Sequence, residues 1–163
     1  MTAQVKRLKK VSSGFTLIEL LVVIGILAVL LAIVLIAINP ARQFSQANNT
    51  KRRSDVNAIL NGVHQYGADN KGNIAAMSIP KTGTTTATAG AEIASTTVNL
   101  YPFLVPTYIA ALPVDPLTNN GAAVATYSGS YITRYFITQS QSDNRITVWA
   151  LDAELGQVIG VTR

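Results

Sequence analysis

The stretch FTLIELLVVIGILAVLLAIVLIAI, residues 15–38, sets the organisation of the whole chain. From Leu20 to Ile38 no residue carries a charge, and Gly25 alone interrupts the run of alanine and larger apolar side chains. At about 1.5 Å per residue, a helix over 15–38 is roughly 36 Å long, enough to cross a bilayer core of about 30 Å. The segment is longer than the apolar region of a secretory signal, and no A-x-A-like cleavage site follows it. The pattern therefore predicts a transmembrane helix.

Positive charge is concentrated ahead of this helix. The chain has 13 Lys and Arg against 8 Asp and Glu, a formal net charge of +5. Four of the basic residues lie in residues 1–14, which contain no acid, so the remainder is nearly neutral. The basic pI is therefore no argument for nucleic-acid binding. We interpret residues 1–14 as a basic leader that keeps the N-terminus in the cytoplasm. Its basic residues are Lys6, Arg7, Lys9 and Lys10.

Glu19 is an acid inside an otherwise apolar segment, and the sequence leaves two explanations open. The carboxylate can lie in the headgroup region, where the cost of a charge is lower than at the bilayer centre. Alternatively, it awaits a positive partner. A cut after Gly14 would create an α-amino group on Phe15, four residues before Glu19 and on the same helix face. Such a pair, within one chain or between neighbours, could fix the register of parallel helices.

Residues 39–70 predict an amphipathic continuation of the helix. Pro40 lies at the junction, and we expect one long helix, about 15–66, with a kink there; two helices joined by a turn are the alternative. Gly72, in the helix stop GADNKGN (67–73), is expected to cap the C-terminus in a left-handed conformation. The expected apolar face comprises Phe44, Ala47, Val56, Ile59, Leu60, Val63 and Tyr66, and the expected polar face Arg42, Gln46, Lys51, Arg52, Asp55 and Asn61.

The remaining residues, 71–163, predict a globular head. Residues 81–98 are rich in Thr, Ala and Gly and are expected to form a variable, exposed loop. The prolines of 100–121 indicate a short helical turn followed by an ordered loop. Three strands are expected at 131–139, 145–153 and 157–162, with a hairpin turn at 140–144. The fold class is therefore α+β, with the amphipathic half of the helix packed on a small antiparallel sheet.

The N-terminal residues resemble the type IV pilin and type II secretion pseudopilin family. SSGFTLIELLVVIGILAVLLA is similar to the prepilin leader junction of that family. The resemblance implies a pilin fold, cleavage after Gly14 by a membrane prepilin peptidase and N-methylation of Phe15. It also implies that Glu19 pairs with the Phe15 amine of a neighbour in a filament of this and related pilin subunits. An assembly ATPase and an inner-membrane platform protein would be further partners. The subunit would then pass from the cytoplasmic membrane to an extracellular or periplasmic filament.

A weaker resemblance to pseudopilins continues in TYIAALPVDPLTN, residues 107–119. Many of those proteins hold calcium in the loops of the sheet, which makes Asp115, Asp143 and Asp152 candidate ligands. Their spacing matches no compact calcium loop, so turn and cap roles are the alternative. The position of Pro40 and the lack of cysteine favour the pseudopilin branch or a short pilin-like branch of the family.

Catalytic residues are not expected anywhere in the chain. There is no cysteine, and His64 is the single histidine, so thiolate and multi-histidine metal sites are excluded. No G-x-S-x-G elbow or Gly-rich phosphate loop is present. The run TKRRSD (50–55) is interpreted as a solvated face, a contact with another subunit or a contact with anionic lipid or nucleic acid. Trp149 is expected in the core. The rival function is a permanently anchored extracytoplasmic binding module, either an adhesin or a DNA-uptake component.

Overall fold

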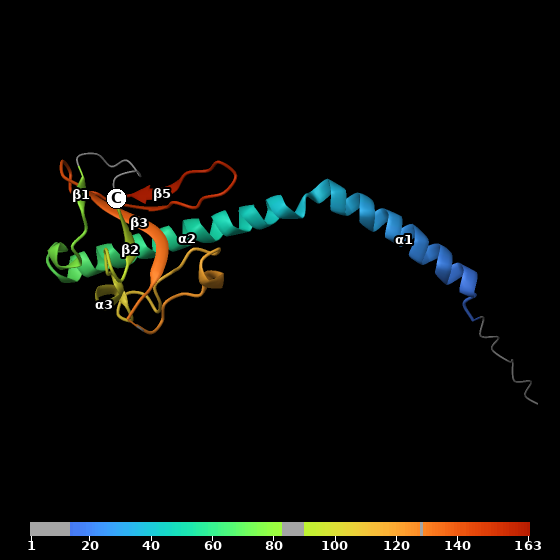
Figure 1. The fold of residues 1–163 in the computed structure, drawn as a ribbon, viewed down its shortest axis with the longest axis horizontal. Coiled ribbons are helices and arrows are strands. Elements are labelled where there is room, and N and C mark those ends of the chain that lie inside the picture. Colours follow the sequence, from blue (N-terminus) through green and yellow to red (C-terminus); the bar gives the residue numbers. More distant parts are fainter. Residues whose placement is uncertain (1–13, 83–89, 128) are drawn as a thin grey trace, which may run out of the picture. The chain divides into compact units, whose positions relative to one another are not determined.

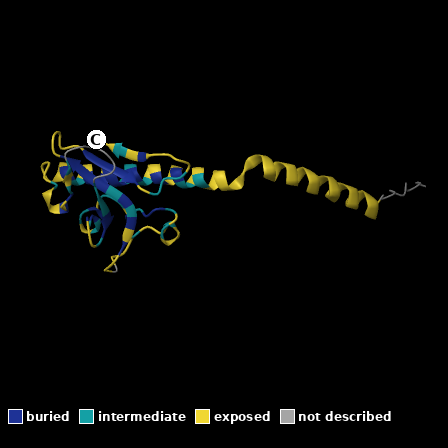
Figure 2. Cartoon of the chain, turned by 45° about the horizontal axis from the view of Figure 1, so that its top comes forward, coloured by how far each residue is buried: buried dark blue, intermediate teal, exposed yellow. Residues whose placement is uncertain are grey.

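A computed structural model of the chain describes residues 14–82, 90–127 and 129–163. The chain divides into two compact units, Met1–Pro40 and Ala41–Arg163, which are considered separately. In the first unit, helix α1 spans Leu17–Ile38, and none of its residues is buried (Figure 1, Figure 2). The predicted leader lies outside the described residues up to Ser13. The expected long apolar helix is confirmed.

Helix α2 spans Pro40–Asp69 and follows α1 after a single residue. Asn39 is that residue, and its backbone is left-handed, with φ 47° and ψ 80°. Proline is well suited to the first position of a helix, because its missing N–H would have no intrahelical partner there. The interruption falls where it was expected, but it separates two helices instead of bending one continuous helix.

The C-terminal end of α2 is closed by the predicted glycine. Gly72 has φ 82°, and its N–H donates to the Gly67 carbonyl at 2.7 Å. This bond satisfies a carbonyl of the last turn, as in glycine-capped helices generally. The helix stop at 67–73 is confirmed.

Within the described residues the sheet has five strands: β1 Lys81–Thr82, β2 Ala91–Ala94, β3 Ile132–Ser140, β4 Ile146–Ala150 and β5 Ile159–Thr162. Strands β3, β4 and β5 form the predicted antiparallel meander, with Tyr135 opposite Ala150 and Val148 opposite Val161. Strand β2 pairs antiparallel and β1 parallel with β3, so the sheet is mixed. The α+β class and the three C-terminal strands are confirmed.

The expectation of an exposed loop over 81–98 is wrong at both of its ends. Strands β1 and β2 lie in this range, and Ile93 and Val98 are almost fully buried. Alanine and threonine dominate the segment, so its few core positions make no visible alternation, and pairing with β3 decides the conformation. Residues 83–89 lie outside the described residues. The short turn expected in 100–121 is confirmed by α3 (Tyr101–Leu104) and the 3₁₀ helix Asn119–Gly121.

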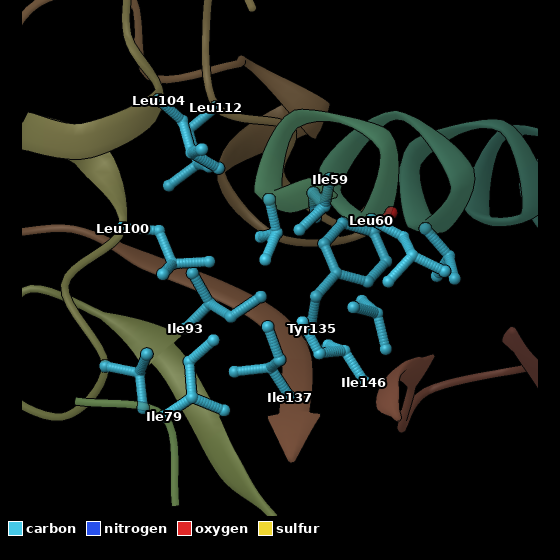
Figure 3. Packing of buried hydrophobic residues seen from close by; sticks show 14 of the residues in the cluster. Ile59, Leu60, Ile79, Ile93, Leu100, Leu104, Leu112, Tyr135, Ile137 and Ile146 are labelled. Atoms are coloured by element: carbon cyan, nitrogen blue, oxygen red, sulfur yellow. The ribbon is translucent and has the colours of Figure 1, made fainter. Parts of the chain in front are cut away.

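The hydrophobic core lies entirely in the second unit. Figure 3 shows Ile59 and Leu60 of α2 packed toward Tyr135 and Ile137 of β3. These side chains are fully buried, and each of the aliphatic ones contributes about 1.5–3 kcal/mol of transfer free energy. The predicted apolar face is correct from Val56 onward but wrong at its start, because Phe44 and Ala47 are exposed. That first part of the helix has a polar partner instead, since Ser45 and Asn48 donate to Glu154 in the loop between β4 and β5.

Candidate functional site

The start of α1 holds the predicted processing residues Gly14 and Phe15 and the predicted assembly residue Glu19, whereas Pro40, also a candidate for assembly, begins α2. Gly14, Phe15 and Thr16 precede the helix in non-helical backbone, and all three are exposed. The Gly14–Phe15 bond therefore lies outside the hydrogen-bonded helix. Phe15 is 82% exposed, and Leu17, the first helical residue, is 81% exposed.

Glu19 closes a capping box with Thr16. The Oε2 atom of Glu19 accepts from the Thr16 backbone N–H at 2.8 Å and from the Thr16 hydroxyl at 2.7 Å. In return, the Glu19 N–H donates to Thr16 Oγ1 at 3.3 Å. The two residues thus satisfy donors that a helix N-terminus leaves without intrahelical partners. This arrangement holds the carboxylate at the first turn of the apolar helix.

Thr16 is the residue that the sequence reasoning missed. The signature Thr-x-x-Glu directly before an apolar run was visible in Thr16–Glu19 and predicts a capping box. It adds a third explanation for Glu19 to the two considered above. The acid has a partner within its own chain, in addition to any partner that processing creates.

Helix α1 itself is the single helix among the described residues that is long and apolar enough to cross a membrane. Its 22 residues span about 33 Å at 1.5 Å per residue. A helix that is apolar on all sides cannot be the half-buried surface helix of a water-soluble domain.

A family model described as the prokaryotic N-terminal methylation motif matches residues 9–35. The chain carries the hallmark motif of type IV pilin-like prepilins. The resemblance drawn from SSGFTLIELLVVIGILAVLLA is thereby confirmed for the N-terminal segment. No curated protein and no solved structure matches the chain significantly.

The three aspartates considered as calcium ligands each pair with a different arginine. Asp115 accepts from Arg52, Asp152 from Arg134, and Asp143 lies 3.4 Å from Arg145. Hydrogen bonds from Arg134 hold the pKa of Asp152 below its usual value, and a hydrogen bond from Ser140 does the same for Asp143. Within the described ranges, no three His, Cys, Asp or Glu side chains are grouped to hold a metal.

The run TKRRSD contributes a buried ion cluster instead of a uniformly solvated face. The Arg52 side chain is fully buried and donates to both carboxylate oxygens of Asp115, at 2.6 and 3.1 Å. Its Nη1 also donates to Glu154 at 2.8 Å and to Asn49 at 2.9 Å. Burial alone would lower the pKa of Arg52, but the two carboxylates raise it, so the guanidinium stays charged. The assignment of Arg52 to the polar, exposed face is wrong.

Glu154 ties the loop between β4 and β5 to α2. Its carboxylate accepts from Ser45 at 2.8 Å and from Asn48 at 2.9 Å, in addition to Arg52. Its backbone N–H donates to Asn49 Oδ1, and its carbonyl accepts from Asn49 Nδ2. The hydrogen bond from Arg52, followed by those from Asn48 and Ser45, lowers the pKa of Glu154. The role of Glu154 is structural, since its carboxylate and backbone groups form hydrogen bonds with side chains of α2.

Other residues of TKRRSD also have partners within the second unit. Lys51 Nζ donates to the Gly121 carbonyl at 3.0 Å, and Arg53 donates to Gln157 at 2.8 Å. Asp55 accepts from the Tyr135 hydroxyl at 2.7 Å, while its burial raises its pKa. Trp149 is 4% exposed and stacks on Phe136, which confirms that it is buried.

Proposed function

We propose that the chain is a structural subunit of a type IV pilus-like or type II secretion pseudopilus filament. It would be made as a single-pass prepilin in the cytoplasmic membrane, with its N-terminus in the cytoplasm. The observation that carries the proposal is Glu19 at the first turn of a fully apolar helix, inside the matched methylation motif. No catalytic role follows from this motif, and the function is one of packing.

Processing after Gly14 is supported by the local backbone. A peptidase needs an accessible, non-helical substrate, and the residues on both sides of the Gly14–Phe15 bond are exposed and precede α1. Cleavage would remove the basic leader and leave an α-amino group on Phe15. A prepilin peptidase that also N-methylates this amine is the expected partner, as the motif implies.

Assembly through α1 follows from the physics of helices in lipid. Lipid tails are as apolar as leucine, so hydrophobicity gives little drive for one α1 helix to leave lipid for another. A specific polar pair can supply register, because each partner is poorly solvated if it remains alone. In this proposal Glu19 exchanges its Thr16 hydrogen bonds for the Phe15 amine of a neighbouring copy. An assembly ATPase and a membrane platform protein would drive the exchange.

The second unit would form the outer surface of such a filament. It has its own core within Ala41–Arg163, and none of the buried core residues comes from α1. The helix can therefore change from lipid to protein neighbours without disturbing the packing of that core. This independence is what a subunit with two successive environments requires.

The N-terminal mass of the protein from its native cells is the first test. A mature chain that begins at methylated Phe15 is expected. An intact Met1, or cleavage at any other bond, would instead favour the permanently anchored binding module.

The second test compares wild-type filaments with Glu19→Ala and Glu19→Gln. Both variants should reach wild-type levels in the membrane but be depleted from the sheared filament fraction. Thr16→Val is the matched control, because it removes the hydroxyl donor to Glu19 and keeps the carboxylate for pairing. Normal polymerisation of Glu19→Ala would refute the pairing mechanism.

A further inference from the structure

The loops before β3 form a surface without charge of their own. Between Ile93 and Thr133 the sequence contains one charged residue, Asp115, and it is fully buried against Arg52. Residues 118–131 read TNNGAAVATYSGSY. Tyrosine, serine, glycine and asparagine are the residues that antibody loops use for recognition, because they combine rigid aromatic area with adaptable hydrogen bonding.

An open groove of about 550 Å³ lies along these loops. Its volume is within the range of about 300–1,000 Å³ that is typical of small-ligand sites. None of its described lining residues is charged, and five carry side-chain hydroxyl or amide groups. The cations that flank the loops are already engaged, Lys51 with the Gly121 carbonyl and Arg134 with Asp152. The five are Thr118, Asn119, Thr126, Ser130 and Tyr131, and the Tyr131 hydroxyl is already bonded to Asn99.

Three contacting tyrosine rings, here called the Tyr127 platform, continue from the groove, because Tyr131 lines the groove and also contacts Tyr127. The Tyr127 ring is 47% exposed and lies 5.5 Å from the Tyr101 ring and 6.3 Å from the Tyr131 ring, between centroids. The two supporting rings are anchored: the Tyr101 hydroxyl donates to the Ala125 carbonyl at 2.9 Å, and the Tyr131 hydroxyl donates to Asn99 at 2.8 Å. The exposed ring is thus held in place before any ligand arrives, which reduces the entropy lost on binding.

We propose that the groove and the Tyr127 platform bind a neutral oligosaccharide. A sugar ring offers an apolar C–H face for stacking on an aromatic ring and hydroxyls for the groove's amide and hydroxyl groups. An anionic ligand or a nucleic acid would need Lys or Arg, and the lining has neither. A purely apolar ligand would leave the polar lining groups without partners. The proposal is independent of filament assembly.

The test uses the full chain in phosphatidylcholine nanodiscs, since many mild detergents are themselves glycosides. Binding of maltotriose, cellotriose and triacetylchitotriose is measured by saturation-transfer NMR and calorimetry, with 3′-sialyllactose as the anionic comparison. We expect at least one neutral trisaccharide to bind with a dissociation constant of roughly 1 mM or below, more tightly than the sialylated one. Tyr127→Ala should weaken that binding by about tenfold, because it removes the exposed aromatic face on which the sugar would stack.

Two further variants keep the result interpretable. Phe44→Ala removes an exposed aromatic ring from α2, which does not line the groove, and should leave binding unchanged. Thr126→Lys places a charge on an exposed lining position and should abolish binding without altering the thermal unfolding midpoint. Absence of binding by all three neutral probes at about 10 mM, or unchanged binding in Tyr127→Ala, would overturn the proposal. So would a Thr126→Lys chain that binds sugar normally but fails to enter filaments, because the groove would then be a subunit contact.

Discussion

Replacing Asp115 with alanine is expected to be among the most damaging single changes to the second unit. The carboxylate and the Arg52 guanidinium are both fully buried, and the substitution removes two hydrogen bonds from that guanidinium. It also removes the acceptor for the Leu117 N–H, which donates to Asp115 at 2.9 Å. A buried charge that loses its partner typically costs about 3–5 kcal/mol.

The remaining partners of Arg52 place the expected loss at the lower end of that range. Glu154 and Asn49 still accept from its Nη1, at 2.8 and 2.9 Å. We therefore expect a loss of about 3 kcal/mol, a large share of the roughly 5–15 kcal/mol that stabilises a domain. For a unit of this size, that corresponds to a fall in Tm of roughly 10–15 °C.

The assay is urea unfolding of Ala41–Arg163, which contains the hydrophobic core of the described residues. Unfolding is monitored by circular dichroism and tryptophan fluorescence. Asp143→Ala is the matched control, because its ion pair with Arg145 is exposed and its loss should change the unfolding free energy much less than Asp115→Ala does. The double variant Arg52→Met/Asp115→Leu should recover most of the lost stability, because it removes both charges together. A loss below about 1 kcal/mol in Asp115→Ala would show that Arg52 is not buried as described.

Two further predictions concern Glu154, which pairs with Arg52, and the packing around Gly90 next to the sheet. The pKa of Glu154 is lowered from 4.5, so its pairing with Arg52 stabilises the fold above about pH 4.5 and is lost as the pH falls through the lower folded-state value. The stability difference between wild type and Glu154→Gln should therefore be full at pH 7 and shrink toward zero in acid; a constant difference would contradict the pairing. Gly90→Ala should destabilise the second unit, since the added Cβ would lie 2.2 Å from the Trp149 ring and 2.6 Å from the Ile137 carbonyl. Gly129→Ala is a control for steric contact, because no atom lies within 4 Å there, although its φ of 91° adds strain. Equal unfolding midpoints for wild type and Gly90→Ala would refute the steric argument.

Sequence reasoning succeeded where a single local pattern decides the structure. The apolar run of α1, the glycine stop at Gly72 and the β-branched strands near the C-terminus each carry their own signal. The motif at residues 9–35 is also local, since Gly14, Phe15 and Glu19 are close in sequence. Such features need no knowledge of distant partners.

It failed where the partner is far away in the chain. Arg52 lies in a basic run that looks solvated, and its burial depends on Asp115 and Glu154, more than 60 residues later. Strand β2 is too short and too rich in alanine to be predicted from its own sequence. Its conformation depends on antiparallel pairing with β3. The role of Thr16 was missed for a different reason, because its capping signature with Glu19 is local and could have been recognised in the sequence.

The buried ion cluster and the apolar helix meet different physical demands on the two units. Every charge in the Arg52 cluster is satisfied by residues of Ala41–Arg163, and no buried side-chain nitrogen or oxygen among the described residues lacks a partner. The buried polar groups of the second unit therefore need no partner from outside that unit. Helix α1 is the opposite case, with no buried residue and one acid whose hydrogen bonds come from Thr16 at its own exposed end. A polar group held by an exposed neighbour can exchange partners at low cost, whereas one held inside a core cannot. Under the proposed filament role, the exchangeable charge thus lies in the helix that would change its environment, and the fixed charges lie in the unit that would keep its shape.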